Sequence, residues 1–182
     1  DSSFSLRSEL DELQRIVRDE YSELRNYMRR LRTPSFEGHE LEKAIRSYAK
    51  AFERENNLKV RVSVPNSPIR LPRKISREFY QIIHEALTNV RKHSGAKHVL
   101  VELIQKEDLF SLVISDDGLG FSTHSNEDKK GKGVPWSISE RANALQGSTR
   151  VESTPGQGCR LTINIPAHVA STYGEISGVN PR

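Results

Sequence analysis

One short stretch of the chain, 109–121, constrains the fold more than any other. It begins with an apolar run, 109–114, whose β-branched and aromatic residues predict a buried strand. Two acids and two glycines follow, in the order Asp116-Asp117-Gly118-Leu119-Gly120, and then Phe121. Glycine lets the backbone turn sharply and approach a ligand closely, but Asp-Gly between strands also predicts an ordinary hairpin turn. The rest of the chain has to decide between a ligand site and a simple turn.

Composition restricts the class of protein. Of the 182 residues, 35% are apolar and 29% are charged, which predicts one real core with one more polar appendage. No apolar run approaches the ~20 residues of a membrane span, and no signal-peptide pattern is present. The single Cys159 excludes an internal disulfide framework and fits a reducing compartment. The net charge of +4 is spread along the chain without interleaved aromatics, so we expect no nucleic-acid partner.

These observations predict a cytoplasmic location and no membrane contact by the chain itself. The sequence starts at Asp1 rather than Met, so we expect an excised fragment. The longer parent protein can still be membrane-anchored.

Residues 2–31 have the pattern of one long helix. Apolar residues recur at alternating spacings of four and three, broken at Glu20. A narrow stripe of period 3.5 is typical of a coiled coil or helical bundle, so we expect a homodimer through this helix. The alternative is a solvated helix that lies on the following domain. Pro34 stops the helix, and we place the domains at 1–33 and 34–166, followed by a polar, patternless tail at 167–182.

Amphipathic helices are expected at about 38–55 and 75–93, with a half-buried strand at 58–64 between them. On the second helix, Glu85 and Asn89 lie one turn apart, and Lys92 and His93 follow one turn later. A carboxylate and an amide carbonyl at this spacing suit Mg²⁺ beside substrate phosphates, which Lys92 and His93 are placed to meet. The alternative is an ordinary amphipathic helix whose polar side faces water.

The remaining pattern predicts strands at 97–105 and 109–115, a helix at about 135–146 and a final hairpin of 149–153 with 159–165. The loop 122–133 is polar, has no apolar anchor and carries lysines placed to cover an anion. Gly131 and Gly133 come just before the helix that begins with Pro135, and a helix N-terminus offers free N–H groups to phosphate.

The order of these pieces resembles the ATP-binding (GHKL) domain shared by gyrase, Hsp90, histidine kinases and MutL. The amino-acid sequence at 84–94, at 116–121 and at Glu140-Arg141-Ala142 most resembles bacterial sensor histidine kinases that are paired with NarL-type response regulators. The resemblance covers about 38–166. Its motifs are Glu85-x-x-x-Asn89, Asp116-x-Gly118-x-Gly120, the Gly-rich loop before a helix, and Gly156-x-Gly158.

The resemblance implies an α+β fold, a two-layer sandwich whose mixed, mostly antiparallel sheet carries helices on one face, with ATP and Mg²⁺ bound. It implies that Asp116 binds the adenine amine and that Gly118 and Gly120 admit the base. It also implies that Asn89 binds Mg²⁺, with Glu85 beside it to position the metal or a water. The other residues that the resemblance assigns to ATP are Lys92, His93, Phe121, Gly131, Lys132, Gly133 and Val134, with Gly131 and Gly133 as hinges of a lid.

In this subfamily the dimerisation unit is a helical hairpin, and Leu31-Arg32-Thr33-Pro34 resembles the end of its second helix. The phosphoacceptor histidine belongs to the first helix, and residues 1–33 contain no histidine. We therefore expect a protein-histidine kinase that passes the γ-phosphoryl group of ATP to an acceptor outside this chain. As this fragment it is not expected to autophosphorylate.

Two departures from the family pattern affect the site. Gly133 sits eight residues before Arg141 where seven is usual, which shifts the register of the lid, and Cys159 stands where Thr is common, which weakens the support of Asp116. Two other functions remain open. One is an ATP-binding module without phosphotransfer that switches a coiled-coil dimer, and the other is an ATPase that uses Glu85 as a general base for water.

Overall fold

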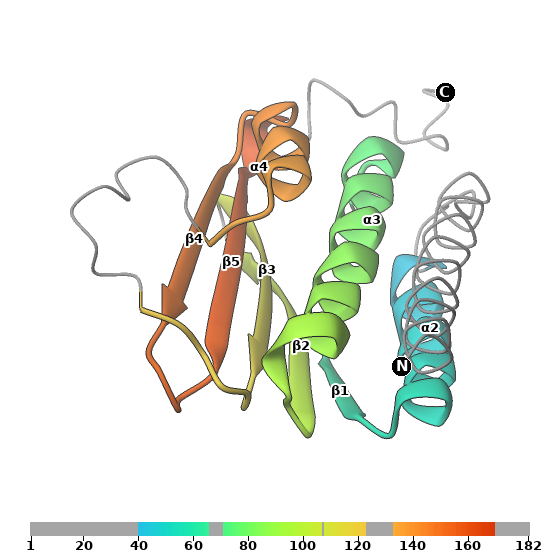
Figure 1. Cartoon of the computed structure of the whole chain (residues 1–182). Coiled ribbons are helices and arrows are strands. Elements are labelled where there is room, and N and C mark those ends of the chain that lie inside the picture. The colour runs from blue at the N-terminus through green and yellow to red at the C-terminus, as the bar shows by residue number, and fades with distance from the viewer. Residues whose placement is uncertain (1–39, 66–70, 107, 123–132, 170–182) are drawn as a thin grey trace, which may run out of the picture. The chain divides into compact units, whose positions relative to one another are not determined.

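The computed structural model of the protein describes residues 40–65, 71–106, 108–122 and 133–169 (Figure 1). The chain divides into two units, Asp1–Pro34 and Ser35–Arg182, and every described residue belongs to the second. The expected heptad helix, Gly131, Lys132 and most of the polar tail lie outside the described residues.

The described elements follow the predicted order of helices and strands. They are α2 (Glu40–Asn56), β1 (Lys59–Ser63), α3 (Arg73–Asn89), the π-helical turn η1 (Val90–Ser94), β2 (His98–Lys106), β3 (Leu109–Asp116), α4 (Trp136–Asn143), β4 (Ser148–Ser153) and β5 (Cys159–Pro166). Within the described ranges, none of the helices combines the length and hydropathy that a membrane span requires.

The five strands form one mixed sheet in the order β1-β2-β3-β5-β4. Strand β1 pairs with β2 in parallel, and all other neighbours are antiparallel. Helices α2, α3 and α4 lie on one face of this sheet (Figure 1). The expected α+β architecture, a mostly antiparallel sheet with helices on one face, is therefore confirmed.

The core lies between the helices and the facing side of the sheet. Alternate residues of β5 are buried, as expected when one face of a strand meets helices. Phe79 and Ile82 of α3 are fully buried, and each such side chain contributes ~1.5–3 kcal/mol by leaving water. The core also reaches beyond the predicted domain end at 166. Val169 is buried within it, and the Ala167 N–H donates to the Asp108 carbonyl at 2.9 Å.

The helix expected at 75–93 changes character near its end. It is α-helical to Asn89 and π-helical over the last five residues, which the sequence pattern did not predict. The Ser94 hydroxyl donates to the Val90 carbonyl at 2.8 Å, so a side chain competes for a helix acceptor in this turn. Gly95 then adopts φ +63° and ends the helix, because glycine takes the left-handed conformation readily.

Candidate functional site

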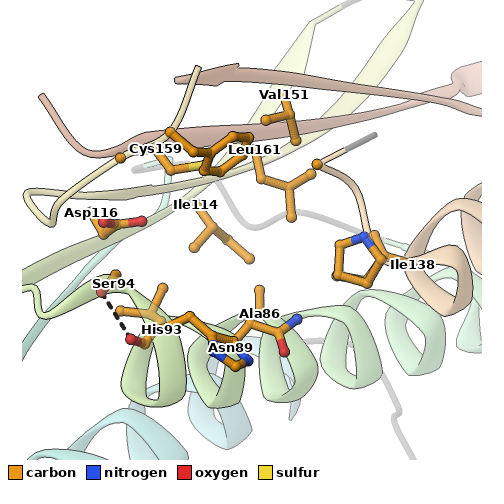
Figure 2. A pocket seen from close by; sticks show the side chains of 15 residues that line it. Ala86, Asn89, His93, Ser94, Ile114, Asp116, Ile138, Val151, Cys159 and Leu161 are labelled. Atoms are coloured by element: carbon orange, nitrogen blue, oxygen red, sulfur yellow. Dashed lines mark hydrogen bonds between the residues drawn. The ribbon is translucent and has the colours of Figure 1, made fainter. Parts of the chain in front are cut away.

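A pocket of about 350 Å³ lies between the end of α3 and the sheet (Figure 2). Asp116 and Cys159 stand together on the sheet side, and Asn89 belongs to the helix that forms the opposite wall (Figure 2). Most of the wall between them is aliphatic, which suits a flat heterocycle more than a small ion. The lining residues are Ala86, Asn89, Val90, His93, Ser94, Ile114, Asp116, Gly120, Phe121, Gly133, Pro135, Ile138, Val151, Cys159 and Leu161.

Asp116 is the last residue of β3 and the only acidic residue that lines this pocket among the described residues. The Gly118 N–H donates to Asp116 Oδ1 at 2.9 Å, so the carboxylate is oriented by its own loop. Burial raises the pKa of Asp116 above its usual value, and the nearby Asp117 charge adds to this, while the Gly118 hydrogen bond acts in the opposite direction. The second oxygen can accept a hydrogen bond from a ligand amine.

The neighbouring Asp117 has a different environment, although the two acids are consecutive in the chain. Its side chain is exposed and outside the pocket, and Oδ1 accepts the N–H groups of Lys97 and His98, both at 2.8 Å. Oδ2 lies 2.7 Å from His98 Nδ1. The backbone and ring hydrogen bonds of His98 lower the pKa of Asp117 to about 2. Asp117 therefore joins β2 to the loop after β3, whereas Asp116 faces the pocket.

Gly118 is needed for a reason that the sequence reading missed. It was expected to admit a base, but it does not line the pocket. A Cβ at this position would overlap the Ser94 carbonyl oxygen. The adjacent Leu119 N–H donates to that same oxygen at 2.7 Å. The absence of a side chain thus lets the loop after β3 pack against the end of η1.

Gly120 and Gly158 allow a second close approach of backbones. Gly120 lines the pocket as expected and has φ +58°. A Cβ at this position would overlap the Thr154 carbonyl oxygen. Gly158, at φ +75°, approaches the Asp116 carbonyl oxygen so closely that any Cβ would overlap it. These contacts hold the loop after β3 against the β4–β5 turn and so fix the position of Asp116.

Cys159 is the cross-strand neighbour of Asp116 in the β3–β5 pair. Burial raises the pKa of its thiol to about 11, and the charge of Asp116 adds to this. The thiol therefore stays protonated at neutral pH. A thiol is a weaker hydrogen-bond donor than a hydroxyl, so the weaker support of Asp116 that the family comparison implies for Cys159 stays a prediction.

The helix side of the pocket uses one face of α3 and η1. Ala86, Asn89 and His93 line it, because residues three and four apart share a helix face. Lys92 is exposed and is not among the lining residues. Of the expected phosphate contacts on this helix, the structure thus places His93 at the pocket and Lys92 beside it.

Glu85 lies one turn before Asn89 but does not line the pocket. Its Oε1 accepts a hydrogen bond from the Ser137 hydroxyl of α4, and its Oε2 is buried with no hydrogen-bond partner in the described part of the chain. Sequence reasoning did not single out Ser137. No local signal exists for a contact between residues so far apart in the chain.

Phe121 and Gly133 form the rim on the side of the predicted lid. Gly133 has φ +111°, and a Cβ there would lie 2.9 Å from Phe121 Cε2. The Phe121 N–H donates to Ser153 Oγ at 2.9 Å, which anchors the rim to β4. Val134 is half-buried and packs against the core instead of lining the pocket. The structure does not describe Gly131 and Lys132, so their expected contacts with ATP are not tested.

The residues of the pocket fit a nucleotide with a divalent cation better than a metal alone. Within the described part of the chain, no three His, Cys, Asp or Glu side chains gather as a cation site. A hard cation here would take most of its oxygens from phosphates and water, with the amide oxygen of Asn89 as the protein ligand. Glu85, one turn before Asn89, carries an oxygen that has no hydrogen-bond partner among the described residues.

Residues 74–169, more than half of the chain, match the family described as histidine kinase-, DNA gyrase B-, and HSP90-like ATPase. This matched segment contains every residue that lines the pocket.

Two curated proteins are similar to the chain over most of its length. It is 29% identical over 158 residues to the signal transduction histidine-protein kinase/phosphatase DegS of Brevibacillus brevis, covering 87% of this chain and 40% of that protein. It is 30% identical over 145 residues to the oxygen sensor histidine kinase NreB of Staphylococcus carnosus, covering 79% of this chain and 41% of that protein. The chain thus spans less than half of the length of these relatives.

Solved structures share the fold. The histidine kinase domain of the Erythrobacter litoralis EL346 blue-light activated histidine kinase superposes with a TM-score of 0.61 at 17% identity, covering 79% of this chain and 68% of that one. The Acinetobacter baumannii histidine kinase AdeS superposes with a TM-score of 0.53 at 19% identity, covering 69% and 61%.

Proposed function

This chain belongs to the family of histidine kinase-, DNA gyrase B- and HSP90-like ATPases, as the ATP-binding domain of a sensor histidine kinase, and we propose that it transfers the γ-phosphoryl group of ATP to a histidine outside this chain. The observation that carries the proposal is the pocket itself. In the pocket, the half-buried carboxylate of Asp116 and the amide of Asn89 lie on opposite sides, with aliphatic side chains lining the space between them.

At the base end, we assign Asp116 to the recognition of adenine. An adenine amine can donate to the oxygen of Asp116 that the Gly118 N–H leaves open. Ile114, Val151 and Leu161 offer aliphatic surface to the faces of the ring. Excluding water from this contact strengthens the hydrogen bond and makes the loss of the carboxylate costly.

At the phosphate end, we assign the magnesium ligand to Asn89 and phosphate contacts to His93, Lys92 and Lys132. Bound Mg²⁺ would neutralise charge on the phosphates, which is a main component of catalysis in phosphoryl transfer. Gly131 and Gly133 are the proposed hinges of the segment that covers the phosphates. Glu85 would orient a water or the cation from one turn away.

The transfer needs little covalent chemistry from the domain. A neutral imidazole nitrogen of the acceptor attacks the γ-phosphorus, the bond to the bridging oxygen breaks, and ADP leaves with that electron pair. Residues 1–33 contain no histidine, so we assign the acceptor to a helix outside this chain. The domain supplies position and electrostatic stabilisation.

Three further features belong to the same proposal. Residues 1–33 form the second helix of a dimerisation hairpin and join two copies of the chain. The phosphohistidine passes its phosphoryl group to a response regulator of the NarL type, which the similarity to DegS and NreB supports. The domain works in the cytoplasm, consistent with one cysteine and no disulfide framework.

A second function keeps the nucleotide site but omits the transfer. In that case ATP occupancy switches a coiled-coil dimer, and the lack of a histidine in residues 1–33 favours this reading for the chain as given. The match to relatives named as histidine kinases favours transfer.

Labelled ATP tests both functions. The chain is mixed with a histidine-containing acceptor hairpin from a similar kinase, and acid-labile label on the hairpin is followed over hours. Transfer predicts labelled histidine that requires Mg²⁺, and a His→Ala hairpin gives the background. Binding of ATP without any labelled histidine would contradict transfer and leave the switching module.

A further inference from the structure

Helices α3 and α4 are joined by two polar contacts. The Ser137 hydroxyl donates to Glu85 Oε1, and Arg141 Nη1 donates to Glu78 Oε2 at 2.8 Å. Ser137 and Arg141 lie one turn apart on α4, and Glu78 and Glu85 lie two turns apart on α3, so both contacts follow the same seam. The contacts differ in chemistry, because Arg141–Glu78 joins two opposite charges whereas Ser137–Glu85 joins a neutral hydroxyl to a carboxylate. Arg141 Nε is itself buried with no hydrogen-bond partner among the described residues.

The Glu85 carboxylate is only partly satisfied. Ser137 provides the hydrogen bond to Oε1, while Oε2 is buried with no partner among the described residues. A carboxylate has about four acceptor sites, and leaving a buried one unfilled is costly in a folded protein. A buried acceptor that is left open in this way requires an explanation, and a place for a bound water or cation is one that suits a carboxylate.

Glu85, which carries the open oxygen, is a neighbour along α3 of residues at the proposed phosphate end. Glu85 is followed directly by Ala86 and, one turn later, by Asn89, and both line the pocket. On the other helix, Ser137 is followed by Ile138, which lines the pocket as well, and Pro135 lines its edge. The hydrogen bond therefore ties the helix that follows the pocket rim to the acidic residue beside the proposed magnesium ligand.

We propose that Ser137 is a positioning residue for phosphoryl transfer, which fixes Glu85 through Oε1 so that Oε2 keeps one orientation beside Asn89. This inference rests on the proposed function. A carboxylate held by one oxygen presents the other in a single direction, whereas an unheld carboxylate rotates among several. Ser137 thereby makes the orientation of Glu85 depend on the position of α4.

Four variants of the full chain test this coupling: Ser137→Ala, Ser137→Thr, Glu85→Gln, and the double variant Ser137→Ala with Glu85→Gln. Ser139→Ala is the matched control, because it changes the same helix at a hydroxyl for which no hydrogen bond is described. Transfer to the acceptor hairpin, the affinity for ATP with Mg²⁺, and the thermal unfolding midpoint are measured for each variant.

Ser137→Ala is expected to slow transfer about 10- to 100-fold, the usual loss when the partner that orients a ligating or catalytic group is removed. The affinity for ATP should change by no more than about twofold, because Ser137 is not among the lining residues. Ser137→Thr should restore most of the rate, and Ser139→Ala should match the wild type. In the Glu85→Gln background, Ser137→Ala should slow transfer further by less than about twofold.

Several results would overturn the inference. Equal slowing by Ser137→Ala in both backgrounds would show that Ser137 acts on the fold and not through Glu85. If the decreases in the unfolding midpoint of Ser137→Ala and Glu85→Gln simply add in the double variant, the two side chains do not interact. That result would exclude the hydrogen bond between them. If the wild type transfers the phosphoryl group and Ser137→Ala does so equally fast or faster, the inference about Ser137 is wrong and the proposed function stands. A wild type that binds no ATP removes the proposed function too.

Discussion

The two ends of the pocket are built in different ways. At the proposed base end, the close contacts are between backbone atoms: Gly158 approaches the carbonyl of Asp116, and Gly118 packs against the carbonyl of Ser94. At the proposed phosphate end, the described contributors are side chains at helix ends, Asn89 and His93. A site made of close backbone contacts tolerates few substitutions, because no rotamer change can relieve the overlap. A site made of side chains loses function on substitution but keeps its fold.

The largest expected effect tests the backbone assembly of the base end. Gly158→Ala forces a Cβ onto the Asp116 carbonyl at φ +75°, and we expect a loss of several kcal/mol in the free energy of unfolding, measured in urea. Gly156→Ala is the matched control in the same turn. It has φ +79° but open space around its Cβ, so it should cost only about 1 kcal/mol. Equal losses would show that the Asp116 contact is not restrictive.

A change at the phosphate end should spare the fold and affect the cation. Asn89→Ala is expected to reduce the affinity for ATP about 10- to 100-fold in the presence of Mg²⁺ and to leave the affinity in EDTA nearly unchanged. Isothermal titration calorimetry at both conditions measures the difference. If Mg²⁺ still strengthens binding in this variant as much as in the wild type, Asn89 is not the magnesium ligand.

Acid should affect the two adjacent aspartates in opposite ways. The pKa of Asp116 is raised in the folded state, so protonation in acid relieves a cost to stability, but it removes the proposed acceptor for adenine. Affinity for ATP should therefore fall as the pH falls through this raised pKa, above the usual 3.8. In Asp116→Asn, the affinity for ATP should not show this fall in acid. The same fall in the variant would show that another group titrates.

The pKa of Asp117 is lowered, and its contribution to stability has the opposite sign. That contribution is complete above 3.8 and is lost as the pH falls from 3.8 to about 2. Asp117→Asn should cost only about 0.5–1 kcal/mol at neutral pH, because the side chain is exposed, and should flatten stability over this window. It should not alter the affinity for ATP. A large loss of affinity would show that Asp117, and not Asp116 alone, contacts the nucleotide.

Local pattern was sufficient to predict most of the helices and strands. The period of the apolar residues located α2 and α3, and alternation located β1, because each element buries one face. The acidic residue that faces the pocket was also predictable. Asp116 ends a buried strand, and a side chain at that position continues the alternation of the core face.

Contacts between distant residues were not predictable. Ser137 reaches Glu85 across 52 positions, and no spacing rule relates two helices that fold separately. Gly118 was read as space for a base, whereas its neighbour is the Ser94 carbonyl, which only tertiary structure places there. The π-helical end of α3 and the burial of Val169 likewise depend on packing that periodicity does not encode.

The most direct test of the central assignment compares two nucleotides on two proteins by calorimetry. Wild type should bind ATP about 100-fold more tightly than inosine triphosphate, whose ring carries an oxygen in place of the amine from which Asp116 is proposed to accept a hydrogen bond. In Asp116→Asn that preference should fall to near unity, with an unfolding midpoint close to that of the wild type. An unchanged preference for ATP in the variant would contradict Asp116 as the residue that recognises the base.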